Sequence, residues 1–343
     1  MRHLLNTLFV LTEDSYLALE GENVVVLRGE EASARFPLHT LEGILCFSYR
    51  GASPALMGAC AQRGVALCFL TPNGRFLARV SGETHGNVLL RKAQYALSED
   101  PSGSCRLARS MIAGKLLNAR WVLERATRDH GLRVDLPALK AASAALAGAA
   151  RLAAEAEAPD VLRGIEGEAA SRYFGVFDEL ILQSKEDFFF RTRSRRPPLD
   201  NMNALLSFVY AVLAADCAAA LEAVGLDPYV GFLHGDRPGR ASLGLDLMEE
   251  LRPCFADRFA LTCINTRLIR PEHFERSESG ATAMTDAGRR ALLAAYQEKK
   301  REPITHPFLG EKIPWGLVPY LQALLLVRCL RGDLDGYPPF IWK

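Results

Sequence analysis

The chain has 343 residues, more than one ordinary hydrophobic core accommodates, which predicts two domains. Hydrophobic residues make up 49% of it and charged residues 24%, as in an ordinary globular protein. The formal net charge of +1 by itself says nothing about nucleic-acid binding, so any basic surface must be local.

The eight cysteines form no CxxC pair and lie mostly in apolar runs, which predicts buried free thiols in a reducing compartment. The first residues lack a signal-peptide cleavage pattern. The longest apolar runs are interrupted or too short to cross a bilayer. We therefore expect a cytoplasmic protein.

Residues 1–85 have the alternation and turn signals of short strands and contain no cluster of acids and histidines. One helix is expected at 54–63, with Gly64 as its C-terminal stop. Asn73-Gly74 is a strong hairpin signal, and 76–80 is expected to return beside 65–70. We expect a β-rich domain that serves dimerisation or placement.

From residue 86 the pattern becomes helical, and 271–283 and the C-terminal tail are among the stretches that read as irregular. The predicted fold class is therefore α+β, with a small N-terminal β-rich domain (1–85) and a larger all-α catalytic domain (86–343). A helix expected at 108–126 has a basic side that is either solvated or phosphate-binding; its basic residues are Lys115, Arg120 and Arg125, with Arg128 just beyond.

Glu166 lies between Gly164 and Gly167 in a long helical pattern. Each interior glycine costs a helix roughly 1 kcal/mol relative to alanine. A lone helical glutamate is usually a surface charge, but this context favours a close approach of backbone or ligand around Glu166.

Two arginine-containing segments predict local phosphate contacts. Four arginines in six residues follow three phenylalanines: Arg191, Arg193, Arg195 and Arg196. Arg237 and Arg240 lie in the turn GDRPGR. Arginines in turns also serve structure alone, and both interpretations stay open here.

The stretch 231–252, GFLHGDRPGRASLGLDLMEELR, concentrates the chemistry. His234 ends an apolar run, and Ser242 is a candidate N-cap for the helix that follows. Asp246, Glu249 and Glu250 are spaced so that all three can share one side of that helix. An imidazole facing carboxylates predicts a site for a divalent metal, completed by a carboxylate from elsewhere in the chain.

Four segments together resemble the CRISPR-associated integrase that captures new spacers, the first of the two universal adaptation proteins. They are GIEGEAASRYF, NALLSFVYAVL, GFLHGDRPGRASLGLDLMEELRP and INTRLI, and their order and spacing agree across essentially the whole chain. The ending PYLQALLLVRCLRGDLDGYPPFIWK resembles the version found beside type I-C systems.

The resemblance implies metal ligands at Glu166, His234 and Glu249, with Asp246 as a neighbouring catalytic acid and Glu250 as a bystander. This chain has Glu249 where many members have aspartate. The implied cofactor is Mg²⁺ or Mn²⁺, which suits the mixed oxygen and nitrogen donors.

The reaction implied by the resemblance is transesterification, in which the 3′-hydroxyl of a captured double-stranded DNA fragment attacks the phosphodiester at a CRISPR repeat end. The reverse reaction, or attack by water, gives metal-dependent endonuclease activity of the hydrolase type. The implied partners are a second copy of the chain, bound through the β-rich domain, and a small second adaptation protein that completes a heterohexamer. The alternatives are another helical metal-dependent DNA nuclease and a non-enzymatic DNA-binding scaffold.

Overall fold

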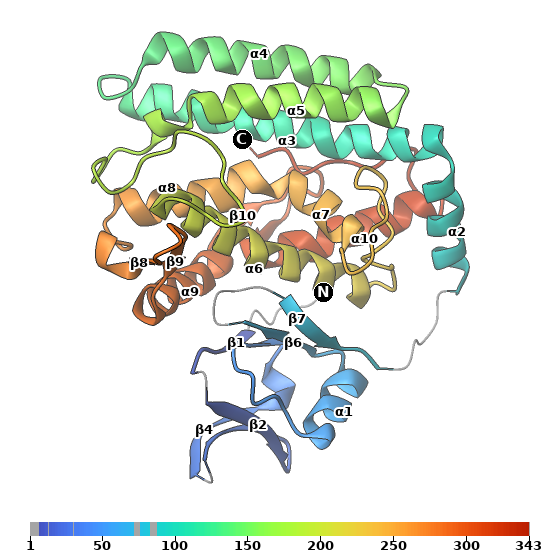
Figure 1. The fold of residues 1–343 in the computed structure, drawn as a ribbon. Helices are drawn as coiled ribbons and strands as arrows, with labels where there is room; N and C mark the ends of the chain where they lie inside the picture. Colours follow the sequence, from blue (N-terminus) through green and yellow to red (C-terminus); the bar gives the residue numbers. More distant parts are fainter. Residues whose placement is uncertain (1–6, 13, 30, 72–75, 83–87, 343) are drawn as a thin grey trace.

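The computed structural model of the protein describes residues 7–12, 14–29, 31–71, 76–82 and 88–342. A β-rich N-terminal part is followed by a mostly helical part (Figure 1). The predicted α+β fold class is confirmed. The two segments lie at opposite ends of the view, and the long helices α3, α4 and α5 cover the side farthest from the strands (Figure 1).

The β-rich part contains two sheets. In the first, β1, β5 and β6 run parallel and β7 returns antiparallel to β6. In the second, β2, β3 and β4 form an antiparallel meander. The bounds are β1 Thr7–Val10, β2 Ser15–Glu20, β3 Asn23–Arg28, β4 Glu31–Pro37, β5 Gly43–Cys46, α1 Pro54–Arg63, β6 Ala66–Leu70 and β7 Phe76–Val80.

Local chemistry explains the elements that the sequence predicted best. Helix α1 has the predicted bounds, because the Ser53 side chain accepts from the Leu56 N–H and Gly64 ends the helix with a φ of 67°. Strand β7 returns beside β6 as predicted. The predicted turn at Asn73-Gly74 lies outside the described residues.

The central parallel strands β5 and β6 are buried on both faces of the sheet, which is why both are continuous apolar runs. Ile44 and Leu67 face the core of the β-rich part, whereas Leu45 and Phe47 belong to the core of the helical part. The Phe47 ring stacks 6.1 Å from that of Phe208. The two parts therefore share packed apolar surface.

The helical part begins at α2. The next three helices, α3, α4 and α5, pack against one another. The bounds are α2 Val88–Glu99, α3 Pro101–His130, α4 Leu136–Glu155, α5 Pro159–Gly175, α6 Asn201–Ala223, α7 Ser242–Glu249, α8 Arg258–Asn265, β8 Phe274–Arg276, β9 Thr282–Met284, α9 Asp286–Arg301, β10 Pro303–Thr305, β11 Lys312–Pro314 and α10 Val318–Leu330.

One local prediction was wrong, and two local features were not predicted. The segment 271–283, expected to be irregular, contributes to the antiparallel pair β8–β9. A second short pair, β10–β11, was not predicted. The strands have three residues each, too few to show an alternation in the sequence. The run after α7 is a π-helical turn, Arg252–Asp257, before α8 begins.

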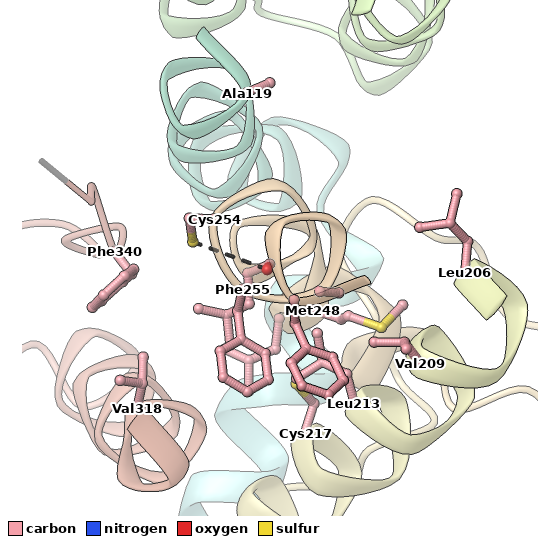
Figure 2. Packing of buried hydrophobic residues seen from close by; sticks show 14 of the residues in the cluster. Ala119, Leu206, Val209, Leu213, Cys217, Met248, Cys254, Phe255, Val318 and Phe340 are labelled. Atoms are coloured by element: carbon pink, nitrogen blue, oxygen red, sulfur yellow. Dashed lines mark hydrogen bonds between the residues drawn. The ribbon is translucent and has the colours of Figure 1, made fainter. Parts of the chain in front are cut away.

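Helix α6 is the core helix that the sequence predicted. By length and composition it is apolar enough to cross a membrane, contrary to our expectation for the longest apolar runs, but 67% of its most apolar window is buried in the protein. Figure 2 shows residues of this core from α3, α6, α7, the π-turn, α10 and the tail: Ala119, Leu206, Val209, Leu213, Cys217, Met248, Cys254, Phe255, Val318 and Phe340.

The eight cysteines are free, and all except Cys329 are buried, as predicted. Burial raises the pKa of the Cys254 thiol well above its ordinary value, which keeps it protonated and unreactive. These side chains act as small apolar groups.

Phe255 provides a test of this core, since its side chain is 4% exposed and its ring centroid lies 5.5 Å from Tyr296 and 5.3 Å from Trp315. We predict that Phe255→Ala lowers the free energy of unfolding by about 3–5 kcal/mol, through lost burial and a cavity. Urea denaturation followed by circular dichroism measures this. Leu152→Ala, at a 59% exposed position on α4, is the control and should change it by less than about 0.5 kcal/mol. Equal losses in the two variants would contradict the packing described.

Candidate active site

His234 is held by the buried carboxylate of Asp246, which is 1% exposed. Asp246 Oδ2 accepts from the backbone N–H groups of Phe232 (2.6 Å) and Leu233 (3.0 Å). Asp246 Oδ1 accepts from the backbone N–H of His234 (3.0 Å) and contacts its ring Nδ1 at 2.6 Å. One side chain on α7 thus fixes both the backbone of the loop and the orientation of the imidazole.

This contact also assigns the imidazole proton. An ionised carboxylate only accepts hydrogen bonds, so Nδ1 of His234 carries the proton and Nε2 presents a lone pair. Nε2 faces Glu249, whose Oε1 lies 3.9 Å away. A carboxylate behind a histidine is the usual outer support of a metal-binding imidazole.

Glu166 and Glu249 come from different helices and meet at one ammonium group. Lys115 on α3 ion-pairs with Glu166 on α5, and its Nζ lies 2.6 Å from Glu249 Oε2. The Glu249 contact is an ion pair without hydrogen-bond geometry, and no hydrogen bond reaches Oε2. The three predicted ligands are therefore linked through Lys115 and through the His234–Glu249 contact.

Glu249 is held as an anion. Burial alone would raise the pKa of this carboxyl, but the charges of Arg252 and Lys115 outweigh burial and lower the pKa to about 2. Arg252 Nη2 lies 3.2 Å from Glu249 Oε1. The site thus retains an ionised carboxylate in a buried position, ready to bind a cation.

Glu250 points away from this cluster, so the prediction that three acids share one side of the helix was wrong. Its Oε1 accepts from Gln322 (2.9 Å) and from the Tyr337 hydroxyl (2.5 Å), and its Oε2 accepts from the Phe340 N–H (2.8 Å). Burial raises the pKa of Glu250 to about 7, although these donors lower it. Glu250 anchors the C-terminal tail.

The residues present fit a divalent cation. Among the residues that the structure describes, no three His, Cys, Asp or Glu side chains are grouped closely enough to hold a metal directly. The Lys115 ammonium lies between the two glutamates. Glu249 Oε2 is nevertheless a buried carboxylate oxygen that accepts no hydrogen bond, and Nε2 of His234 is the ring nitrogen that faces Glu249 while Nδ1 contacts Asp246. Oxygen donors with one imidazole suit Mg²⁺ or Mn²⁺.

Beneath the cluster lies a buried acid with two tyrosines. The hydroxyls of Tyr173 (3.1 Å) and Tyr210 (2.5 Å) donate to Asp257, which is 1% exposed. Burial raises the pKa of Asp257 to about 6, against the lowering effect of the two hydroxyls and of Arg252. Asp257 fixes Tyr210, whose ring in turn contacts Arg252 with 5.1 Å from guanidinium carbon to ring centroid.

The arginines of the 191–196 loop divide into two kinds. Arg193 is built into the fold: it donates to Asn203 Oδ1 (2.8 Å) and to Ser207 Oγ (3.0 Å), and it lies over the Tyr210 ring at 5.5 Å. The others are exposed: Arg191, Arg195 and Arg196.

The turn GDRPGR divides in the same way. Arg240 folds back onto the Gly235 carbonyl oxygen and the Ser242 hydroxyl, whereas Arg237 is exposed. Ser242 is the first residue of α7 and donates to Gly235, so it is not the predicted N-cap.

No protein atom approaches the glycines beside Glu166. A Cβ at Gly164 or Gly167 would meet nothing within 4 Å. The predicted close approach by backbone is therefore wrong, and this surface of α5 stays open around a half-buried Glu166.

Sequence reasoning did not place two cations at the site: Lys115, which it assigned to a solvated or phosphate-binding side of the helix but which is buried, and Arg252. The sequence carried a signal for each. Lys115 lies three residues after Ile112 and one before Leu116, which places it beside the apolar stripe of α3 rather than on a solvated side. Arg252 lies three residues after Glu249, one helical turn away.

The chain is similar throughout to proteins of one family. The family model described as "CRISPR associated protein Cas1" matches residues 8–298. The chain is 51% identical, over the full length of both proteins, to the "CRISPR-associated endonuclease Cas1 1" of Chlorobaculum tepidum.

Two solved structures share the fold. One is a casposase bound to its integration product, with a TM-score of 0.83 and 21% identity over 97% of this chain and 93% of that one. The other is a Cas6-RT-Cas1–Cas2 complex, with a TM-score of 0.80 and 19% identity over 98% of this chain and 36% of that one.

The family model and the full-length match define a CRISPR-associated protein. The chain belongs to the Cas1 family.

The raised pKa of the buried Asp257 carboxyl can be tested through the pH dependence of stability. A folded-state pKa of about 6, above the ordinary 3.8, means that Asp257 stabilises the fold most when protonated, below about pH 4, and that this contribution is lost as pH rises through 6. Asparagine does not titrate. We therefore predict that the unfolding free energy of Asp257→Asn minus that of the wild type increases by up to about 3 kcal/mol as the pH rises from 4 to 7. Urea denaturation across this range measures the difference. Asp236→Asn, on an exposed loop, is the surface control, and a pH-independent difference for Asp257→Asn would contradict the raised pKa.

Proposed function

We propose that this protein is a metal-dependent DNA integrase and endonuclease of CRISPR adaptation, which joins the 3′-hydroxyl ends of captured DNA fragments to the ends of a CRISPR repeat. The observation that carries the proposal is that Glu166 and Glu249 meet at the Lys115 ammonium while Nε2 of His234 lies 3.9 Å from Glu249, so that three separate segments converge on one place. The full-length similarity to a Cas1 endonuclease supports the same activity.

In this proposal Glu166, Glu249 and Nε2 of His234 hold a Mg²⁺ or Mn²⁺ ion. When bound, the ion supplies stabilisation of the charge that builds on the phosphodiester and lowers the pKa of the attacking hydroxyl. Asp246 is a positioning residue, because it holds the Nδ1 proton and the loop and leaves Nε2 free.

Arg252 and the exposed arginines complete the electrostatics. Arg252 keeps Glu249 ionised through their direct ion pair. Arg191, Arg195, Arg196 and Arg237 supply exposed positive charge for the phosphates that flank the reacting bond. Attack by water at the same bond gives hydrolysis, which is the endonuclease reaction.

The proposed assembly follows from two reactions at two repeat ends. Two ends need two active sites, so we propose a homodimer that forms through the β-rich domain 1–85. In this proposal residues 86–343 are the catalytic domain. The Cas1–Cas2 complex that shares this fold supports a small second partner, and with it a heterohexamer; the casposase with its integration product supports DNA as substrate. The ending 319–343 supports a type I-C origin, and the free cysteines support a cytoplasmic location.

Removal of a ligand tests the catalytic assignment. We predict that Glu166→Ala, His234→Ala and Glu249→Ala each lower the rate of fragment joining at least about 1000-fold, because each removes one donor of the ion. The assay uses a short duplex with a free 3′-hydroxyl, a repeat-bearing plasmid and Mn²⁺, with the small partner protein present.

Glu168→Ala is the matched control, since Glu168 is an exposed glutamate on the same helix as Glu166 and should retain full joining. Undiminished joining by the Glu166 or His234 variant would overturn the proposal. Cleavage of DNA without any joining would instead favour a plain nuclease.

The two kinds of arginine on the 191–196 loop give a second test. We predict that Arg195→Ala and Arg196→Ala weaken duplex binding and each reduce the slope of log affinity against log salt by about 1, as expected for a lost phosphate contact. Arg193→Ala should instead lower the free energy of unfolding by about 1–3 kcal/mol, because its partners Asn203 and Ser207 lose a buried donor. Fluorescence anisotropy over a salt series and urea denaturation measure the two effects, and an unchanged salt slope for both surface variants would contradict the DNA contact.

A further inference from the structure

The ammonium group of Lys115 occupies the centre of the proposed ion site. It ion-pairs with both Glu166 and Glu249, although the residue is only 9% exposed. Its neighbours on α3, Ile112 and Leu116, are fully buried in the core. A lysine is seldom buried without compensation, so its charge and those of the two glutamates depend on one another.

The charges in direct contact leave the cluster with one net negative charge. The carboxylates of Glu166, Glu249 and Asp246 face the cations Lys115 and Arg252, and His234 is neutral when it binds a metal. A divalent cation would bring this total to +1. The single negative charge of a phosphodiester would then bring it to zero.

We propose that Lys115 is a built-in counter-charge that holds Glu166 and Glu249 together without metal and competes with the divalent ion, so that tight metal binding depends on the DNA phosphate. This inference rests on the proposed function. With Lys115 neutral, the cluster would carry two negative charges and would match a divalent cation alone.

The surroundings give the displaced ammonium a second position. Lys115 also lines a small cavity of about 20 Å³ together with Tyr210 and Asp257. That volume accommodates about one water-sized group, and Asp257 provides an anion beside it. The ammonium therefore stays near a carboxylate when the glutamates turn to the metal.

The test compares Mn²⁺ binding by the full chain and its variants, measured by isothermal titration calorimetry. Lys115→Met keeps the length of the side chain and removes its charge. We predict that it binds Mn²⁺ about tenfold more tightly than the wild type without DNA. A branched duplex with a 3′-deoxy end binds but does not react. Adding it should raise the Mn²⁺ affinity of the wild type, and the factor of this increase should be about tenfold smaller in the variant.

Thermal unfolding supplies a readout without DNA or catalysis. Lys115→Met should melt several degrees below the wild type in EDTA, because the two glutamates then repel each other, and Mn²⁺ should close most of that gap. Lys140→Met, which removes a half-exposed lysine paired with Glu124, is the matched control and should leave Mn²⁺ affinity unchanged. Lys115→Gln, a neutral side chain that still donates hydrogen bonds, replaces the methionine variant if the latter does not fold.

The outcomes separate the two proposals. Wild-type or weaker Mn²⁺ affinity in a folded, neutral Lys115 variant would overturn the role of Lys115 and leave the proposed function standing. Absence of Mn²⁺ binding by the wild type even with the duplex present, or binding that survives Glu166→Ala, would overturn the proposed function first.

Discussion

The neutralisation of buried negative charge is the constraint on which the rest of this structure depends. Glu249 and Asp246 are nearly inaccessible to water, and Glu166 is half-buried beside them. Carboxylates in such a position must be paired or hydrogen-bonded, or they become protonated. The protein meets this requirement with cations from two other segments, Lys115 from α3 and Arg252 from the π-turn.

Asp246 and Glu249 on α7 and Glu250 just after it point in three directions, and this arrangement joins the site to the rest of the helical part. Asp246 binds the loop that carries His234, and Glu249 faces the reactive cluster. Glu250 binds the C-terminal tail through Phe340 and Tyr337. A helix fixed at both sides by buried carboxylates cannot rotate, so the position of Glu249 is set by contacts that take no part in chemistry.

The sequence predicted what local interactions decide. Helix α1 was predicted to the residue, because Ser53 and Gly64 are caps that act within one turn. The spacing of the three acids at α7 assigned them to one side of the helix, but spacing does not say which neighbours each acid meets in the fold. Glu250 turned away because residues 322–340 supply its donors, some 70 to 90 positions later. The resemblance, not the local pattern, joined Glu166 to His234.

The same limit explains Lys115. Its place beside the apolar stripe of α3 was visible in the sequence, but only tertiary packing brings α3, α5 and α7 together around it. A stack of Arg193, Tyr210 and Arg252 then continues from this point toward the arginine loop. The loop and the site are thus parts of one packed unit, because the ring that orients Arg252 against Glu249 also supports Arg193.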